Sequence, residues 1–258
     1  MLTFLRKIRK SLIESVSTRK YILYAIGEIA LVVIGILIAL QINNWNEAQK
    51  SLKKEIQIYK ELHSELDETL RDVKGDIGDL ERNFNETLKF RDMILKNQFK
   101  RDSVLQQALY GTLDLEQPTP KTSAFESLKS IGLDILSNDS LRQEITSLYQ
   151  LSIPILKNSE SAVEFSIIRR NLSLLLNPYL KINRTKVLEE RERGEIGFGT
   201  TRFMEVQNLE DLVNDELLFL TLQRMLNLRM SITRQHTRVS KRIERAMLKI
   251  EEEIERLD

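Results

Sequence analysis

The sequence predicts an all-α protein in which one N-terminal transmembrane helix continues into an extracytoplasmic antiparallel helical bundle or coiled coil. Three observations lead to this prediction. The chain has nine Gly and four Pro among its 258 residues and is rich in Leu, Glu, Lys, Arg and Ile, which favour helix over sheet. One stretch near the N-terminus is almost wholly apolar. After it, apolar residues recur at the three- and four-residue spacing of packed helices. We therefore expect almost no β-strand.

Residues 1–20 are predicted to form a basic segment on the cytoplasmic side. Its cations are Arg6, Lys7, Arg9, Lys10, Arg19 and Lys20. The apolar residues that share one face of a helical projection are Leu2, Leu5, Ile8 and Leu12. Such a helix can rest on the inner leaflet with its cations near anionic headgroups. A simpler interpretation is that the cations only set the membrane topology, and both can hold together.

Residues 21–42 are predicted to form the transmembrane helix. The twenty residues from Tyr21 to Leu40 contain one charge, and at about 1.5 Å per residue they span about 30 Å, the thickness of a hydrocarbon core. The side chains expected to anchor the helix at the headgroup level are Tyr21, Trp45, Arg19 and Lys20. A cleaved signal peptide would need a shorter apolar run and a small-x-small cleavage site, so a retained anchor is the favoured interpretation.

The flanking charges predict the orientation of this helix. Six cations precede it, whereas no Lys or Arg occurs from Gln41 to Gln49 on the far side. The positive-inside rule then keeps the N-terminus in the cytoplasm. Residues 43–258 become an extracytoplasmic helical bundle domain. In a bacterium with two membranes, the protein would be a single-pass inner-membrane protein with a periplasmic domain.

The apolar run contains one carboxylate, Glu28. At about 100° per residue, it shares one helical stripe with small and aromatic side chains. The predicted contact face is Tyr24, Glu28, Val32, Gly35 and Ala39. Small residues let two helices approach closely, and an intramembrane carboxylate normally faces protein or water. We expect this face to contact a second copy of the chain or another membrane protein, while lipid surrounds the rest.

Three roles for Glu28 remain open at this stage. It can act as a hydrogen-bonding contact between helices, which is the preferred interpretation. It can couple the protein to ion movement, which would make the chain an accessory subunit of an ion-driven membrane machine; this alternative rests on an architectural analogy. It can also serve as a recognition tag for insertion or for the choice of a partner.

Apolar residues follow a heptad pattern beyond the membrane. The first series is Leu52, Ile56, Tyr59, His63, Leu66, Leu70, Val73, Ile77, Leu80 and Phe84. The second is Ile243, Met247, Ile250, Ile254 and Leu257, at the end of a helix expected to start near Asn208. Such spacing keeps one stripe facing a partner helix, and we expect the two series to pack antiparallel. Gly75 and Gly78 predict a kink or tight packing in the first helix.

Several shorter helices are predicted between these two. The expected capping boxes are Ser123 with Glu126 and Ser140 with Gln143. The first helix should end near Gly132. The second should kink or end at Pro154, and helix should then resume up to Asn177, before Pro178. The sequence "GEIGFGTTRF" is predicted to form a turn before the last long helix.

Composition and motifs argue against several kinds of function. A net charge of +1 gives no general attraction to nucleic acid, and the absence of Cys excludes disulfides and thiolate chemistry. His63 and His236 stand alone rather than in a zinc motif, so we expect no metal site. The glycines of "GEIGFGTTRF" follow a charged helical run and lack the spacing of a phosphate loop. We therefore expect no cofactor and no catalytic residues.

Three stretches resemble a known family. They are "FLRKIRKSL", "YAIGEIALVVIGILIALQINNWNE" and "SAFESLKSIGLDILSNDSLRQEITSLY". They are similar to a family of uncharacterised single-span membrane proteins of Bacteroidota-type bacteria. The resemblance implies a Gram-negative inner-membrane setting, and it supplies no activity, substrate or site residues.

The sequence as a whole favours a membrane-anchored helical scaffold, sensor-like or accessory protein that acts through protein–protein contacts without catalysis. The first alternative is the ion-coupled accessory subunit that uses Glu28. The second is a periplasmic enzyme of unknown class, which would need a converging polar pocket. The sequence does not identify a ligand.

Overall fold

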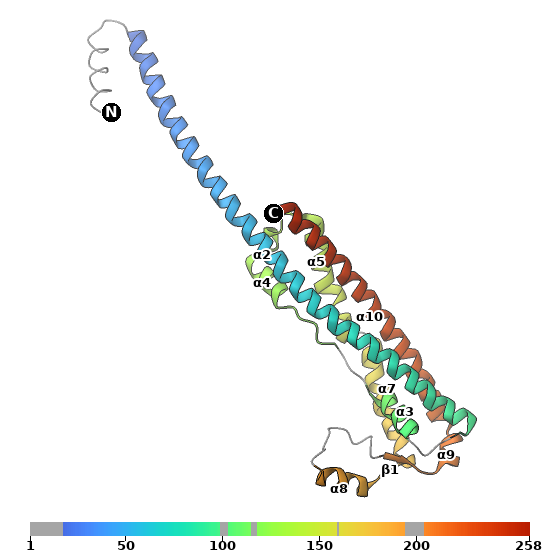
Figure 1. The fold of residues 1–258 in the computed structure, drawn as a ribbon. Helices are drawn as coiled ribbons and strands as arrows, with labels where there is room; N and C mark the ends of the chain where they lie inside the picture. The colour runs from blue at the N-terminus through green and yellow to red at the C-terminus, as the bar shows by residue number, and fades with distance from the viewer. Residues whose placement is uncertain (1–17, 99–102, 115–117, 159, 194–203) are drawn as a thin grey trace. The chain divides into compact units, whose positions relative to one another are not determined.

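The computed structural model describes residues 18–98, 103–114, 118–158, 160–193 and 204–258, and almost all of them are helical (Figure 1). The α-helices are α2 (Thr18–Lys96), α3 (Ser103–Leu113), α4 (Ser123–Ile131), α5 (Asp139–Ser147), α6 (Ile155–Asn158), α7 (Glu160–Leu176), α8 (Arg184–Glu192), α9 (Leu209–Val213) and α10 (Glu216–Leu257). Short 3₁₀ turns cover Leu133–Ile135 and Asn177–Tyr179, and a π-helical turn covers Leu148–Ser152. The predicted helical fold is confirmed for these residues.

The described residues contain one small β-ribbon. Strands β1 (Leu180–Ile182) and β2 (Met204–Val206) pair antiparallel, with Leu180 opposite Val206. Each strand has three residues, which is close to the near-absence of strand that the composition predicts. The ribbon joins the chain after α7 to the chain before α9.

The chain divides into two compact units, residues 1–57 and residues 58–258. Helix α2 contributes to both. In the first unit, the described residues belong to α2 alone. The second unit is a bundle built around the remainder of α2 and the whole of α10.

Helices α2 and α10 lie antiparallel in the second unit. In the side-chain contacts between them, residue numbers rise along α2 and fall along α10. The pairs are His63 with Glu251, Asp76 with His236, and Arg91 with Gln223. Helix α10 also lies along α5 and α7. The predicted pairing of the two apolar series is therefore observed within residues 58–258.

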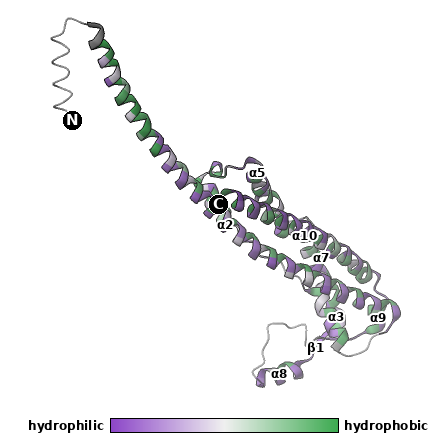
Figure 2. Cartoon of the chain, turned by 45° about the horizontal axis from the view of Figure 1, so that its top comes forward, coloured by the Kyte–Doolittle hydropathy of each residue, from purple (hydrophilic) through white to green (hydrophobic). Residues whose placement is uncertain are grey.

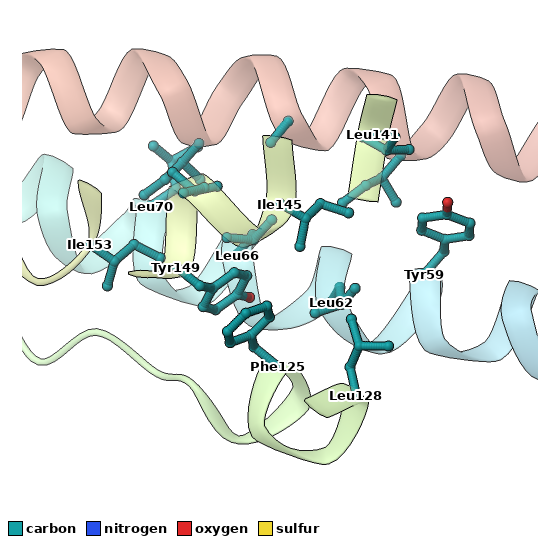
Figure 3. Close-up of a cluster of buried hydrophobic side chains, with 14 of the residues drawn as sticks. Tyr59, Leu62, Leu66, Leu70, Phe125, Leu128, Leu141, Ile145, Tyr149 and Ile153 are labelled. Atoms are coloured by element: carbon teal, nitrogen blue, oxygen red, sulfur yellow. The ribbon is translucent and has the colours of Figure 1, made fainter. Parts of the chain in front are cut away.

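Two hydrophobic clusters fill this bundle. The first joins α2, α4, α5, the π-helical turn, α6 and the C-terminal half of α10 (Figure 3). At its centre the Phe125 and Tyr149 rings stack with centroids 4.5 Å apart. The second joins α2, α3, α7, α9 and the N-terminal half of α10. Burial of a large apolar side chain stabilises a fold by about 1.5–3 kcal/mol, so these clusters supply the main stabilisation of the bundle.

The buried stripe of α2 is wider than the predicted heptad series. Leu66 and Val73 are buried as predicted, whereas Ile77 is only partly buried. Ile58 and Leu62 are buried although they lie outside the series. The reason is that α2 packs against α10 on one side and against α4 and α5 on another, so a two-helix seam underestimates its apolar face.

Both predicted capping boxes are wrong, although α4 and α5 occur where they were expected. Thr122 occupies the N-cap of α4 without a side-chain cap, and Ser123 Oγ instead donates a hydrogen bond to Glu65 on α2, at 2.8 Å. Helix α5 is capped by Asn138, whose side chain accepts a hydrogen bond from the Leu141 backbone N–H at 3.1 Å. A distant carboxylate thus replaces a local cap in α4.

Other predicted helix ends agree with the structure. Gly132 follows α4 with φ 117°, a left-handed conformation that glycine adopts without strain. The π-helical turn precedes Pro154, and α7 ends at Leu176 before Pro178. The turn predicted over "GEIGFGTTRF" lies outside the described residues.

The last long helix does not start near Asn208 as predicted. The short helix α9 begins there, and α10 begins only at Glu216. Asp215 breaks the two apart because its side chain accepts a hydrogen bond from the Leu218 backbone N–H at 2.9 Å and so caps α10. Asp residues favour this capping geometry over a helix interior. The prediction missed this break because it followed the spacing of the apolar residues.

The tight packing expected at Gly75 and Gly78 is not found among the described residues, and the kink stays a prediction. Helix α2 runs through both positions without a break. A Cβ atom added at either glycine would meet no described atom within 4 Å, so no close helix packing requires them.

Candidate functional site

One helix among the described residues, α2, is long and apolar enough to cross a membrane by length and composition. None of the residues in its most apolar window is buried within the described structure. In Figure 2 the ribbon of this stretch carries mostly the colour of hydrophobic residues. Apolar side chains therefore point outward on all sides of the helix, as expected for a helix surrounded by lipid.

The predicted contact face lies on this part of α2. Glu28, Val32, Gly35 and Ala39 are exposed, and Tyr24 is half-buried. In the described part of the chain, no hydrogen bond or ion pair is formed by the Glu28 carboxylate, and no atom lies within 4 Å of a Cβ added at Gly35. The face is thus open along its length.

Of the predicted interfacial anchors, only Trp45 has a described side chain. The Trp45 ring is 64% exposed. The backbone of Arg19, Lys20 and Tyr21 belongs to α2, but their side chains lie outside the described part of the structure. Their predicted role at the headgroup level stays a prediction.

A buried hydrogen bond between His236 and Asp76 lies at the centre of the bundle. His236 Nδ1 of α10 is 2.5 Å from Asp76 Oδ2 of α2, and the two side chains are 2% and 4% exposed. Because a carboxylate only accepts hydrogen bonds, the imidazole N–H donates. Among the described residues, Asp76 Oδ1 and His236 Nε2 have no hydrogen-bond partner. This pair separates the two hydrophobic clusters along α2 and α10.

The sequence did not reveal this pair. His236 was interpreted as a lone imidazole on the last helix, and Asp76 was not singled out. The other histidine, His63, forms a partly exposed contact with Glu251 at 2.7 Å. One signal was available: Asp76 falls within an apolar stripe, three residues after Val73 and four before Leu80. A charge at such a position predicts a buried partner.

A buried arginine fixes the end of α3. Arg229 is fully buried in α10, and its Nη2 donates to the backbone carbonyls of Gly111 and Asp114, each at 2.7 Å. Its guanidinium also lies over the Phe165 ring, 4.9 Å from the centroid. Burial lowers the pKa of Arg229 to about 10, and the Asp114 carboxylate opposes this effect. The guanidinium therefore remains charged at neutral pH, as suits the negative end of a helix dipole.

A third polar centre ties α2 to α4 and to the π-helical turn. Glu65 Oε2 accepts hydrogen bonds from Ser123 Oγ and from the Ala124 backbone N–H, and Glu65 Oε1 accepts from the Tyr149 hydroxyl at 2.9 Å. Burial first, and then the Glu65 carboxylate, raises the pKa of the Tyr149 phenol. Tyr149 hence stays protonated and donates to Glu65, which is the arrangement that a buried carboxylate requires.

These three centres are structural in their geometry. A hollow of about 390 Å³ beside Lys121 is polar, but Glu65 and Glu68 on its wall already bind Ser123 and Lys121. No group of three His, Asp or Glu side chains within the described ranges could hold a metal ion. Each of the three polar centres joins side chains or backbone groups of different helices.

Comparison with known families adds one finding. A model of a family of unknown function, DUF6090, matches residues 28–161, more than half of the 258-residue chain. The chain belongs to this family. The match starts at Glu28 within the apolar part of α2 and extends to the start of α7. No curated protein and no solved structure matches the chain.

Proposed function

We propose that this DUF6090 protein is a single-pass inner-membrane protein whose periplasmic helical bundle acts as a scaffold, sensor-like or accessory module through protein–protein contacts. The observation that carries the proposal is the outward-facing apolar surface of α2 between Ile22 and Ile42. Its apolar residues find no cover within the described structure, and an exposed apolar surface of this extent belongs in lipid or against another protein.

The orientation follows from the charges that flank this stretch. Six cations precede it, and the next Lys is Lys50. The bundle is then periplasmic and the first residues are cytoplasmic. Protein–protein contact is the proposed mode of action because the polar centres of the bundle join helices to one another and leave the exposed faces of α2 free for partners.

Single-cysteine labelling tests the placement. The chain has no Cys, so Ser11→Cys and Ser51→Cys each introduce a unique thiol on either side of the apolar stretch. We expect a membrane-impermeant maleimide to label the Ser51→Cys variant in intact spheroplasts and the Ser11→Cys variant only after lysis. The reverse pattern would place the bundle in the cytoplasm. Labelling of both variants in intact spheroplasts would mean that the apolar stretch does not cross the membrane.

The proposed role of Glu28 is a contact between membrane helices. We expect Glu28→Gln to weaken disulfide cross-linking between copies that carry Ala39→Cys, or to a partner, because the amide replaces a stronger hydrogen-bonding group. Val33→Ile in the same helix serves as a control that keeps the apolar surface. Unchanged cross-linking combined with loss of the cellular phenotype would instead support the ion-coupled accessory role.

A further inference from the structure

Helix α10 carries a strongly basic stretch on the surface of the bundle. Residues 234–249 contain six cations and one carboxylate. The carboxylate, Glu244, pairs with Lys74 of α2 at 2.7 Å, so it does not offset the six cations. The cations are Arg234, Arg238, Lys241, Arg242, Arg245 and Lys249, and all of them are exposed.

The bundle neutralises this stretch only in part. Arg242 donates a hydrogen bond to Ser147 Oγ at 3.1 Å, and Lys249 pairs with Glu144. Both of these contacts reach α5. The cations that form no hydrogen bond or ion pair within the described ranges are Arg238, Lys241 and Arg245. Their charge is therefore available to another molecule.

These three cations belong to a ridge along the exposed face of α10. Its members recur at alternating spacings of four and three residues, so they lie within about 100° of one another around the helix. They are Arg234, Arg238, Lys241, Arg245, Leu248, Glu252 and Glu255, and all seven are exposed. At about 1.5 Å per residue the ridge is about 32 Å long. Such spacing matches the way in which one helix lies along another.

The charge of the ridge changes sign at Leu248. Four cations precede this residue in the ridge, and two carboxylates follow it. Leu248 itself is 59% exposed. Among the described residues, neither Glu252 nor Glu255 has an ion-pair partner. The ridge thus has a direction, with an apolar side chain where its two charged parts meet.

This direction selects among three occupants. A uniformly anionic surface, such as a layer of lipid headgroups, would be attracted by the cations but repelled by Glu252 and Glu255. Under the proposed topology, two copies in one membrane would bring their α10 helices together in parallel, and like charges would then meet along the ridge. A helix of another protein fits the whole ridge when its own charges change sign at the matching place.

We infer that this ridge docks a helix of a partner protein, with carboxylates along the cations, an apolar side chain against Leu248 and a cation at Glu252. This inference rests on the proposed function as a contact module, and it names the chemistry of one partner. The charges guide association and fix the direction of the partner helix. Because exposed ion pairs are individually weak and are screened by salt, the contact is reversible and weakens as the salt concentration rises.

Photo-cross-linking in intact cells tests the inference. A benzoyl-phenylalanine at position 248 reports on the ridge. The same probe at position 217 is the matched control, since Leu217 is 60% exposed on the same helix but lies outside the ridge. We expect an adduct with another protein from position 248 only. Peptide mapping should place it on a segment in which an apolar residue separates an acidic stretch from a cation.

Charge reversal on either side of Leu248 provides the second part of the test. Arg245→Glu should lower the yield of the adduct about fivefold, because it repels the carboxylates of the partner. Glu252→Arg should lower the yield as well, because it repels the cation of the partner, whereas a uniformly anionic partner would bind this variant more tightly. Arg170→Glu is the matched control, since Arg170 is exposed on a different helix, α7.

Three results overturn the inference. They are equal yields at positions 248 and 217, adducts that map to this chain itself, and a yield that Arg245→Glu leaves unchanged or that Glu252→Arg raises. Circular dichroism of the purified variants confirms that the bundle is still folded. Membrane fractionation of the same cells reports separately on the anchor, so loss of the anchor and loss of the ridge contact are distinguishable.

Discussion

Helix α2 contains two regions whose apolar side chains are distributed in opposite ways. Between Ile22 and Ile42 they point outward on all sides, and between Ile58 and Ile94 they are collected on one broad face and buried. The first pattern suits a helix surrounded by an apolar solvent, and the second suits a helix in a water-soluble bundle. The difference shows that the angular distribution of apolar residues, rather than their number, tells which surroundings each region needs.

The strongest way to break the bundle region is to leave a buried polar side chain without its partner. We expect Asp76→Ala to lower the free energy of unfolding by about 3 kcal/mol, because His236 would lose its hydrogen bond at a site that is almost completely buried. Urea unfolding of the detergent-solubilised full chain, followed by circular dichroism, measures the change. Membrane retention should stay the same, since Asp76 lies in the bundle region.

A double substitution separates pairing from packing at this site. Asp76→Leu combined with His236→Leu should recover most of the lost stability, because replacing both partners of a buried polar pair by well-packed apolar residues leaves no unpaired polar group. If Asp76→Ala alone leaves the unfolding midpoint unchanged, the pair does not hold the bundle as described.

The corresponding change in the first region is Val33→Lys. A Lys near the centre of a transmembrane helix costs about 2.5–3.5 kcal/mol of insertion free energy, so we expect a marked fall in the carbonate-resistant membrane fraction. Leu248→Lys on α10 is the control, because Leu248 is 59% exposed on the bundle. Equal membrane fractions for the two variants would contradict the proposal that lipid surrounds the first region of α2 while the bundle lies in water.

A smaller effect concerns the acid stability of the bundle. Arg256 first, and then Asn138, donates hydrogen bonds that lower the pKa of Glu253 below its ordinary 4.5, against the effect of burial. A carboxyl group with a lowered folded-state pKa stabilises the fold above pH 4.5, and this contribution is lost as the pH falls through the folded-state pKa.

We therefore expect Glu253→Gln to reduce stability by about 1 kcal/mol at neutral pH and by progressively less below pH 4.5. Urea midpoints of both proteins across this range give the test. Parallel pH profiles would show that Glu253 has no such linkage.

The smallest expected effect is an increase in stability. Gly75→Ala and Gly78→Ala should each raise the free energy of unfolding by about 0.5–1 kcal/mol, because the helix is continuous there and the added Cβ meets nothing within 4 Å. Gly111→Ala should instead destabilise, since its Cβ would lie 2.6 Å from Glu86 Cβ. Thermal melting of the three variants measures both signs, and a destabilised Gly75→Ala would reveal a packing requirement at that position.

Features that depend on local chemistry could be predicted from the sequence. The length and apolarity of residues 21–42 set the candidate span, and Gly132 and Pro178 mark helix ends through their own backbone preferences. The apolar series on α2 and α10 gave the two long helices and their antiparallel pairing.

Features that depend on which helices face each other could not be predicted in this way. Glu65 binds Ser123 from 58 residues away, and Asp76 binds His236 from 160 residues away. Local capping rules assigned Ser123 to its own helix because they do not know of the distant carboxylate. Arg229 had the same weak signal as Asp76, a charge within an apolar period.

The division of the bundle core by Asp76 and His236 has a consequence for how the protein transmits disturbance. Only α2 and α10 contribute to both hydrophobic clusters among the described helices. The packing of one half of the bundle is therefore continuous with that of the other half through α2 and α10, and the contact between α6 and α7 adds a shorter link between the two halves.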